Sequence, residues 1–216
     1  MEIRYLEKNK TYTNPQRIQP TYIVVHSTAV GMTSRMTLFN AWNSQTAKVS
    51  CHAMVDDEGW TLTLPVDFKG WHVGGKGNGI SIGFEVCEPK SIVYADQWHS
   101  RVNTALYNPA RPSIRNDFIK RWWQAVDCAA YLCKQTGITP DHVLCHSEMN
   151  AIGKATNHVD VTHWFDLFGQ AYNMDAFRAA VAKALRGGEP QTTSVKARVV
   201  PKAIRRPIAR RVNLKN

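Results

Sequence analysis

The stretch that decides the fold is residues 22–29, YIVVHSTA, in which an apolar run leads directly to a histidine. The run YIVV has no charged or amide side chain, which predicts a strand buried on both faces in the centre of an α/β sheet. The strand ends in His26, and α/β proteins usually place their chemistry at the ends of such central strands. His26 is therefore the first candidate for a site residue.

A second short apolar run, residues 142–145 (HVLC), predicts another buried strand and leads to His146. Two further candidates follow, His158 and Asp160. Imidazole nitrogen and carboxylate oxygen are donors that bind zinc, so this cluster is a candidate metal site. Because His158 and Asp160 are two residues apart, an extended segment would point both side chains to one face. Any single histidine is more often a packed or surface residue, but a distant partner at His26 favours the metal site.

The other segments predict alternating helices and strands. A helix that begins at Thr33 or Ser34 and ends near Gln45 is followed by a β-hairpin over residues 50–64. After the hairpin we expect a glycine-rich loop at residues 66–78, a strand at 80–87 and an irregular insertion at 88–112. Two helices are predicted at 113–134 and 175–185. This order predicts an α/β fold with a mixed central β-sheet flanked by helices, and residues 1–21 as a lead-in segment on its surface.

An acid, Glu85, interrupts the apolar strand predicted at residues 80–87. Carboxylates are rarely buried unless they are paired or take part in function. Burial would raise the pKa of Glu85 and suit it to accepting and passing on a proton. The alternative is a structural acid paired with an arginine; the apolar surroundings favour the catalytic role.

The composition is that of a globular domain with an additional basic segment. The chain has 216 residues, 44% of them hydrophobic, and a formal net charge of +10. Residues 188–216 hold eight basic residues and one acid, and so carry +7 of that charge. We therefore expect one domain at residues 1–187, with its core at 20–180, and a basic linker or tail at 188–216.

Several classes of protein are disfavoured. No apolar run approaches the roughly 20 residues of a membrane span, and residues 1–8 lack the apolar core of a signal peptide. The five cysteines include no CxxC pair and are expected to be reduced and mostly buried. The basic tail has no aromatic residue to stack on bases, so nucleic acid is disfavoured as a partner.

Five blocks of sequence follow one another in a recognisable order: IVVHSTA, SCHAMVDDEG, WHVGG, IGFEV, and CHSE with NHVD. Together they resemble the zinc-dependent N-acetylmuramoyl-L-alanine amidases of type 2, whose fold is shared by peptidoglycan recognition proteins. The resemblance covers about residues 20–180. It implies an amidase-like fold in which His26, His146 and Asp160 bind zinc, and Glu85 faces the water that attacks the substrate.

His158 departs from the pattern of many family members, which have a lysine two residues before the aspartate. The chain resembles the branch in which histidine replaces this lysine, and His158 is expected to act in catalysis by stabilising the oxyanion together with zinc. Alternatively, His158 is the third ligand and Asp160 orients it. Trp71 and His72 in the glycine-rich loop are candidates for the substrate groove, with a structural role as the alternative.

The function implied is cleavage of the amide bond between N-acetylmuramic acid and L-alanine in peptidoglycan. Two imidazoles and one carboxylate leave zinc with an open position for water, which suits amide hydrolysis at neutral pH. A wall-cleaving domain without a signal peptide is typical of a phage or prophage endolysin, held in the host cytoplasm until lysis and acting then on the cell wall. The basic tail would attract anionic wall polymers.

Two alternatives to this function remain. The first is a non-catalytic peptidoglycan-binding protein, and the second is a cytoplasmic wall-recycling amidase. All three implied ligand positions hold competent residues, which favours catalysis over binding alone. A recycling enzyme has no evident need of a cationic tail, which favours the endolysin.

Overall fold

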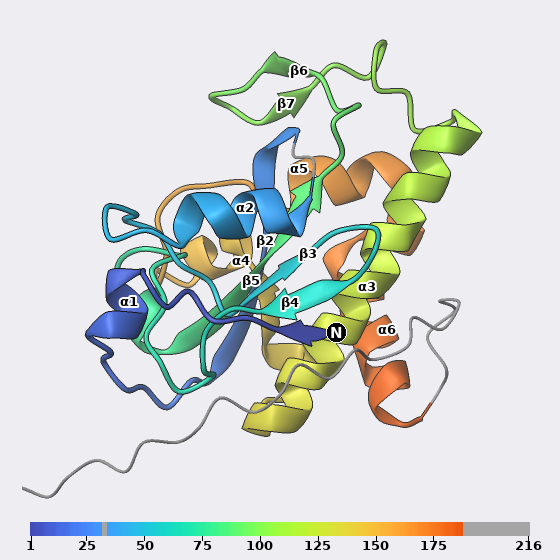
Figure 1. Ribbon diagram of the computed structural model, residues 1–216. Helices are drawn as coiled ribbons and strands as arrows, with labels where there is room; N and C mark the ends of the chain where they lie inside the picture. The colour runs from blue at the N-terminus through green and yellow to red at the C-terminus, as the bar shows by residue number, and fades with distance from the viewer. Residues whose placement is uncertain (32–33, 188–216) are drawn as a thin grey trace, which may run out of the picture.

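The computed structural model describes residues 1–31 and 34–187, and its centre is a six-stranded mixed sheet with helices packed against it (Figure 1). The strands lie in the order β1-β4-β3-β5-β2-β8. β2 (Tyr22–Gly31) lies between β5 (Ser81–Glu88) and β8 (Val143–Cys145) and is parallel to both. β3 (Ala53–Val55) is parallel to β5 and forms the predicted antiparallel hairpin with β4 (Trp60–Leu62). The predicted α/β fold with a mixed sheet is confirmed.

Alternation along β2 divides its side chains between the two faces of the sheet. Ile23 and Val25 belong to the larger core, which packs against α3 (Pro112–Thr136), whereas Val24 packs with Met149 on the other face. α6 (Met174–Leu185) lies against α3 and completes the larger core. His26 is two residues after Val24, so its side chain leaves the face opposite α3.

Short helices border the face on which His26 lies. α2 (Arg35–Trp42) packs against β3 through Leu38, Phe39 and Met54, and α4 (His146–Ala151) packs against β2. The other short elements are α1 (Lys10–Thr13), α5 (Thr162–Phe165) and the 3-10 turns η1 (Gly77–Gly79), η2 (Pro140–His142), η3 (Asp166–Phe168) and η4 (Gln170–Tyr172).

The predicted helices are present, with shifted ends. Ser34 caps α2 by accepting a hydrogen bond from the Thr37 N–H, but the helix ends at Trp42 rather than near Gln45. α3 ends at Gly137, whose φ of +76° is the left-handed conformation that glycine adopts without strain. The strand predicted at 142–145 is one residue shorter, because His142 belongs to the turn η2, and His146 begins α4 directly after β8.

Two segments contain structure that their sequences did not indicate. The insertion at 88–112 carries a second small sheet, in which β6 (Tyr94–Asp96) pairs with β7 (Arg101–Val102). The lead-in segment is not confined to the surface, because β1 (Glu2–Ile3) extends the main sheet beside β4 and Leu6 is fully buried. Strands of two or three residues are too short to show a periodic pattern.

The predicted basic tail, residues 188–216, lies outside the described residues, and the division at 187 stays a prediction. Within residues 1–31 and 34–187, no helix is long and apolar enough to cross a membrane. All five cysteines are free and buried, as predicted, at Cys51, Cys87, Cys128, Cys133 and Cys145.

Candidate metal centre

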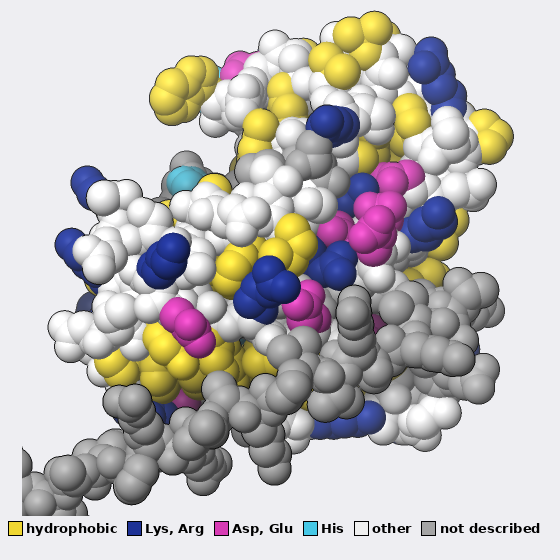
Figure 2. Space-filling model, in the orientation of Figure 1, with side chains coloured by type: hydrophobic (Ala, Val, Ile, Leu, Met, Phe, Trp, Pro, Cys, Tyr) yellow, Lys and Arg dark blue, Asp and Glu magenta, His cyan; other side chains and the backbone are white. Residues whose placement is uncertain are grey.

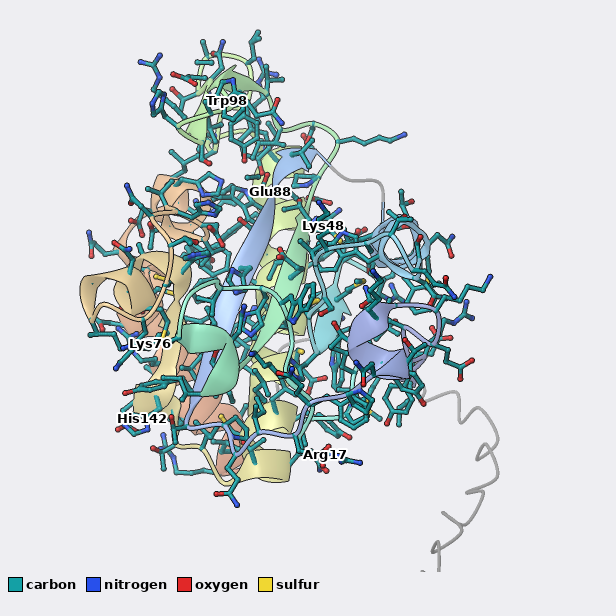
Figure 3. The ribbon with its side chains drawn as sticks, turned by 90° about the vertical axis from the view of Figure 1, so that its left-hand side faces the viewer. Arg17, Lys48, Lys76, Glu88, Trp98 and His142 are labelled. Atoms are coloured by element: carbon teal, nitrogen blue, oxygen red, sulfur yellow. The ribbon has the colours of Figure 1, made fainter. Side chains whose placement is uncertain are left out.

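A cavity of about 400 Å³ opens over the carboxyl-terminal halves of β2 and β5, beside the start of α4. Figure 3 shows these two strands side by side through the middle of the molecule, flanked by helices. All the site residues predicted from sequence line this cavity: His26, Trp71, His72, Glu85, His146, His158 and Asp160. The fold therefore brings together side chains as far apart in sequence as His26 and Asp160.

Three of these side chains converge closely enough to bind one metal ion. Donor atoms of His26, His146 and Asp160 all lie within 4.8 Å of one another, and all three residues are buried. His26 Nδ1 is 2.8 Å from Asp160 Oδ2 and 3.3 Å from His146 Nδ1. His146 Nδ1 is 3.4 Å from Asp160 Oδ1. Two imidazoles and a carboxylate form the ligand set of a catalytic zinc site, which keeps one position open.

The electrostatics of the cluster favour the charge states that a metal requires. Burial alone would raise the pKa of Asp160, but hydrogen bonds with His146 and His26 hold that pKa well below its ordinary value, so the carboxylate is ionised. Burial lowers the pKa of His26, although its contacts with Asp160 act in the opposite direction, so the imidazole is neutral. An ionised carboxylate and a neutral imidazole are the forms that bind zinc.

The loop-borne ligands are held by contacts around the start of α4. The His146 N–H donates to the Asp160 carbonyl oxygen at 3.1 Å, which ties the loop carrying Asp160 to the helix. The Glu148 carboxylate accepts from the Cys145 N–H at 2.9 Å and forms an ion pair with Arg178 at 3.0 Å. These contacts fix the point at which β8 turns into α4, and with it the direction of the His146 side chain.

Glu85 faces the cavity from β5, directly opposite His26 in the β2–β5 pair. Its Oε2 is enclosed and has no hydrogen-bond partner among the described residues. Burial first, and then the carboxylates of Asp160 and Glu88, raise the pKa of Glu85 well above its ordinary value. The alternative of a structural acid paired with an arginine is not seen in the described part of the chain.

His158 lies at the mouth of the cavity rather than within the cluster of donors. Its side chain is 64% exposed, and its Nδ1 is 3.9 Å from Asp160 Oδ1. Its ring lies against that of His146, with ring centres 4.7 Å apart. The segment before α5 is an irregular loop and not an extended strand, so the two side chains differ in burial.

A family model described as N-acetylmuramoyl-L-alanine amidase matches residues 16–161. The matched range contains His26, Glu85, His146 and Asp160, and so covers the whole cluster of donors and the acid beside it. This chain belongs to the N-acetylmuramoyl-L-alanine amidase family. The resemblance inferred from the five sequence blocks is confirmed.

Curated relatives of this family member include two amidases of Bacillus subtilis strain 168. N-acetylmuramoyl-L-alanine amidase XlyA is 33% identical over 120 residues, which cover 50% of this chain and 39% of XlyA. N-acetylmuramoyl-L-alanine amidase CwlH is 42% identical over 76 residues, which cover 32% of this chain and 30% of CwlH. The matched segments thus span less than half the length of these relatives.

Solved structures of amidases share the fold. The catalytic domain of XlyA aligns with a TM-score of 0.56 at 21% identity, covering 83% of this chain and 97% of that domain. The Staphylococcus aureus hydrolase AmiA, solved in complex with its ligand, aligns with a TM-score of 0.63 at 19% identity, covering 87% and 85%. At such identities the likeness is one of fold.

His72 has a contact within the cavity that its sequence did not indicate. Its Nδ1 is 2.9 Å from His26 Nε2, and its Nε2 is 3.4 Å from the Ser81 carbonyl oxygen. A carbonyl oxygen only accepts, so His72 Nε2 carries the proton and Nδ1 of the neutral ring accepts from His26. This tautomer has the His26 proton on Nε2 and leaves Nδ1 able to bind a metal ion, whereas the 2.8 Å hydrogen bond of Nδ1 to the ionised Asp160 carboxylate requires the proton on Nδ1 when no ion lies between them.

The ring of a buried histidine, His52, lies next to that of His72 on the side towards the core. His52 Nε2 donates to the Phe68 carbonyl oxygen at 2.8 Å, and its Nδ1 accepts from the Gly83 N–H at 3.1 Å. Burial lowers the pKa of His52 to about 4, so this ring is neutral in the core. Gly83 leaves the space that His72 fills, because a Cβ there would lie 2.4 Å from His72 Nδ1.

These contacts complete a row of imidazoles from the core to the cavity mouth. Neighbouring ring centres are 5.9, 5.1, 5.0 and 4.7 Å apart along the row His52, His72, His26, His146 and His158. Trp71 is 43% exposed on the cavity rim, where its backbone pairs with Ser50. The WHVGG block therefore supplies one side chain to the rim and one to the interior.

Proposed function

We propose that this chain hydrolyses the amide bond between N-acetylmuramic acid and L-alanine of bacterial peptidoglycan, with one zinc ion as cofactor. The observation that carries the proposal is the convergence of His26, His146 and Asp160 beside the unpartnered carboxylate oxygen of Glu85. Membership of the amidase family supports the same reaction.

The residues present fit a zinc ion. His26 and His146 would bind it through the Nδ1 atoms that face each other, and Asp160 through its carboxylate. Nitrogen donors with a single carboxylate suit zinc better than calcium or magnesium, which prefer oxygen ligands. When bound, zinc supplies a Lewis acid that activates water and polarises the carbonyl group to be attacked.

Glu85 is the proton acceptor and donor in this proposal. Its carboxylate takes a proton from the attacking water and then delivers one to the amine that leaves, which must be protonated for the amide bond to break. The enclosed Oε2 has no competing hydrogen bond, and the raised pKa allows the group to hold a proton between the two steps. The carbonyl carbon and water must meet between Glu85 and the donor cluster.

In this proposal His158 stabilises the negative charge that develops on the carbonyl oxygen. It lies on the cavity rim, outside the donor cluster, with its Nδ1 3.9 Å from Asp160 Oδ1. A protonated imidazole can donate a hydrogen bond to an oxyanion. The alternative, in which His158 is the third ligand, is less well supported because Asp160 already contacts both other donors.

The experiment that tests the reaction is mass spectrometry of purified peptidoglycan digested with the protein, with and without a chelator. The expected products are stem peptides with a free L-alanine amine and glycan strands that carry intact lactyl groups. New reducing sugar ends or cleaved peptide cross-links would contradict the proposal. Binding to the wall without any product would favour the non-catalytic alternative.

We further propose that the protein acts as a phage or prophage endolysin, which reaches the wall only when the host membrane is breached. Peptidoglycan is then its partner, with anionic wall polymers as a second partner through the basic tail. Expressed in a susceptible host, it should cause lysis only after the membrane is permeabilised. Failure to degrade intact walls, together with cleavage of soluble muropeptides, would favour the recycling amidase.

A further inference from the structure

The segment between β5 and α3 forms an arm that carries none of the proposed catalytic groups. It leaves β5 after Glu88, contains the β6–β7 hairpin, and returns to the body at Pro112. The arm projects beyond the main sheet in two perpendicular views (Figures 1 and 3). Its base adjoins the end of β2, where a Cβ at Gly31 would lie 3.2 Å from the Pro89 carbonyl oxygen. The neighbouring residue of β2, Val30, lines the catalytic cavity.

A buried network of hydrogen bonds fixes the base of the arm. The Tyr94 hydroxyl donates to Glu88 Oε2 at 2.6 Å, and the Ser27 hydroxyl donates to Glu88 Oε1 at 2.8 Å. His163 Nε2 lies 2.9 Å from the Tyr94 hydroxyl and 3.0 Å from Glu88 Oε1. Glu88 is completely buried. Residues of β2, β5, β6 and α5 therefore meet at one carboxylate, and the arm is anchored to the strands that carry the site.

The tip of the arm presents Trp98 to solvent, with 94% of its surface exposed. The turn that carries it is held by Asp96, whose carboxylate accepts from the His99 N–H and lies 2.7 Å from His99 Nδ1. Figure 2 shows further hydrophobic side chains exposed over the region of the β6–β7 hairpin.

Trp98 differs from the other tryptophans of the chain. Three are buried, at Trp60, Trp122 and Trp164, two are half-buried, at Trp42 and Trp123, and Trp71 is 43% exposed on the rim of the cavity. An indole held in solvent at the end of an anchored hairpin buries no apolar surface in the core. Together with the hydrophobic side chains exposed in the same region, Trp98 offers a surface to a partner.

The chemistry of the tip fits a sugar ring. The flat apolar face of an indole matches the C–H face of a pyranose, and the exposed amide of Gln97 can bond sugar hydroxyl groups. A cavity of about 400 Å³ has room for the bond being cut and its immediate neighbours. The glycan strand on either side of the muramic acid that carries that bond must cross the surface outside the cavity, and the base of the arm adjoins the end of β2 that lines the cavity.

We propose that Trp98 binds a sugar of the glycan strand outside the catalytic cavity, so that the arm favours polymeric peptidoglycan over short muropeptides. The inference rests on the proposed function, because it takes peptidoglycan as the substrate. It adds a second point of attachment for the same polymer, and attachment at two points lowers the rate at which the polymer leaves.

The test compares Trp98→Ala with Leu106→Ala, a control in the same segment whose side chain is 57% exposed. Binding is measured with peptide-free glycan strands and, separately, with free stem peptides. We expect Trp98→Ala to weaken glycan binding about tenfold, the usual effect of removing an aromatic anchor, and Leu106→Ala to leave it unchanged. Both variants should cleave a single muramoyl peptide at the wild-type rate.

Unchanged glycan binding by Trp98→Ala would overturn the proposal, as would an equal loss in Leu106→Ala. A loss confined to stem peptides would also overturn it, because Trp98 would then bind peptide and not sugar. Failure of the proposed function would look different: the wild-type protein itself would leave the muramoyl peptide uncut, whereas glycan binding requires no cleavage.

Discussion

The two sides of the catalytic cavity are built in different ways. His26 and Glu85 stand on neighbouring central strands, where the β2–β5 register sets them directly opposite each other. His146, His158 and Asp160 come from the start of α4 and the loop after it. The strand side is fixed by the hydrogen bonds of the sheet, whereas the loop side depends on a few contacts, such as that between the His146 N–H and the Asp160 carbonyl oxygen.

This difference indicates which part of the chemistry can change among relatives. A side chain on a central strand is surrounded by packed neighbours, so a new residue there disturbs both the core and the site. His158 is exposed on a loop and can be replaced without disturbing the core. The lysine that the resemblance implies at this position in many amidases is consistent with that freedom.

The largest effect is expected when one ligand is removed from each side. His26→Ala on the strand and Asp160→Ala on the loop should both lose zinc and all measurable activity, because two remaining ligands hold the ion too weakly. Metal content of the purified, folded variants checks this. His99→Ala is the control for metal content, since among the described residues that exposed histidine forms hydrogen bonds to Asp96 alone. Full zinc occupancy in either ligand variant would contradict the assignment.

Glu85→Gln tests the strand side without touching a ligand. It should keep zinc and the fold but lose roughly 10²–10⁴ in kcat, the usual contribution of a positioned acid–base group. Because burial raises the pKa of Glu85, the wild-type rate should fall on the acid side at a higher pH than an ordinary glutamate would give. Glu58→Gln, at an exposed acid, is the matched control. A near-normal rate in Glu85→Gln would remove it from the mechanism.

Variants of His158 test the loop side of the cavity without changing a residue on the strand side. His158→Ala should keep zinc and lose roughly 10²–10³ in kcat, as expected when one oxyanion donor is removed. His158→Lys should recover much of that rate, because an ammonium group on an exposed loop can reach the same oxygen. Metal analysis and single-turnover kinetics on both variants check this. Loss of zinc from His158→Ala would instead make His158 the ligand and Asp160 its support.

A smaller effect on zinc binding is expected from the contact between His72 and His26, which involves the ring nitrogen of His26 that does not face the donor cluster. His72→Leu should weaken zinc binding about 10–100-fold, because His26 loses the partner that keeps its Nδ1 free. His72→Asn should bind zinc nearly normally, since its Oδ1 can accept in place of Nδ1. Zinc affinity, measured by competition with a chelating dye, distinguishes them. Equal affinity in both variants would mean that His72 only fills space.

Gly83→Ala tests the same contact from the neighbouring strand. The added Cβ would lie 2.4 Å from His72 Nδ1 and should displace that ring, so zinc affinity falls although no ligand is changed. Gly79→Ala is the control, because nothing lies within 4 Å of its added Cβ. Circular dichroism at the temperature of the binding assay confirms that both variants are folded. Normal zinc affinity in Gly83→Ala would contradict the arrangement.

The smallest effect concerns stability. The pKa of Glu85 is raised in the folded protein, so the folded state binds more protons than the unfolded state above the ordinary glutamate pKa. The metal-free protein should therefore lose stability as pH rises from that ordinary value through the raised one. Glu85→Gln should remove this loss. Urea unfolding of both proteins across that pH range measures the difference, and parallel pH profiles would contradict it.

The strand side of the site was the more predictable from sequence. The apolar runs at 22–25 and 80–87 are typical of buried strands. His26 follows the first run and Glu85 interrupts the second, and neither side chain suits an apolar core. The loop side was predicted only in part, because the sequence predicts an extended segment at His158 and Asp160, where the chain forms an irregular loop. Burial of Asp160 and exposure of His158 depend on contacts with α4 that no local pattern encodes.

The contact of His72 with His26 and the anchor of the arm on Glu88 could not be predicted from sequence for a related reason. The pairing of His72 with His26 depends on the space left by Gly83, and the anchor of Tyr94 on Glu88 depends on His163 far along the chain. Each is a tertiary contact between residues whose own neighbourhoods indicate loop or strand. The WHVGG block marks His72 as unusual, but only the folded chain shows what it touches.

The row of imidazoles has a consequence for the choice of metal. Sites rich in histidine bind divalent ions with an affinity that rises along the first transition row to copper and falls again at zinc. On donor type alone, the cluster around His26 and His146 would bind copper at least as tightly as zinc. With zinc as the proposed cofactor, copper in the surroundings would compete for the same position and lower the rate of hydrolysis.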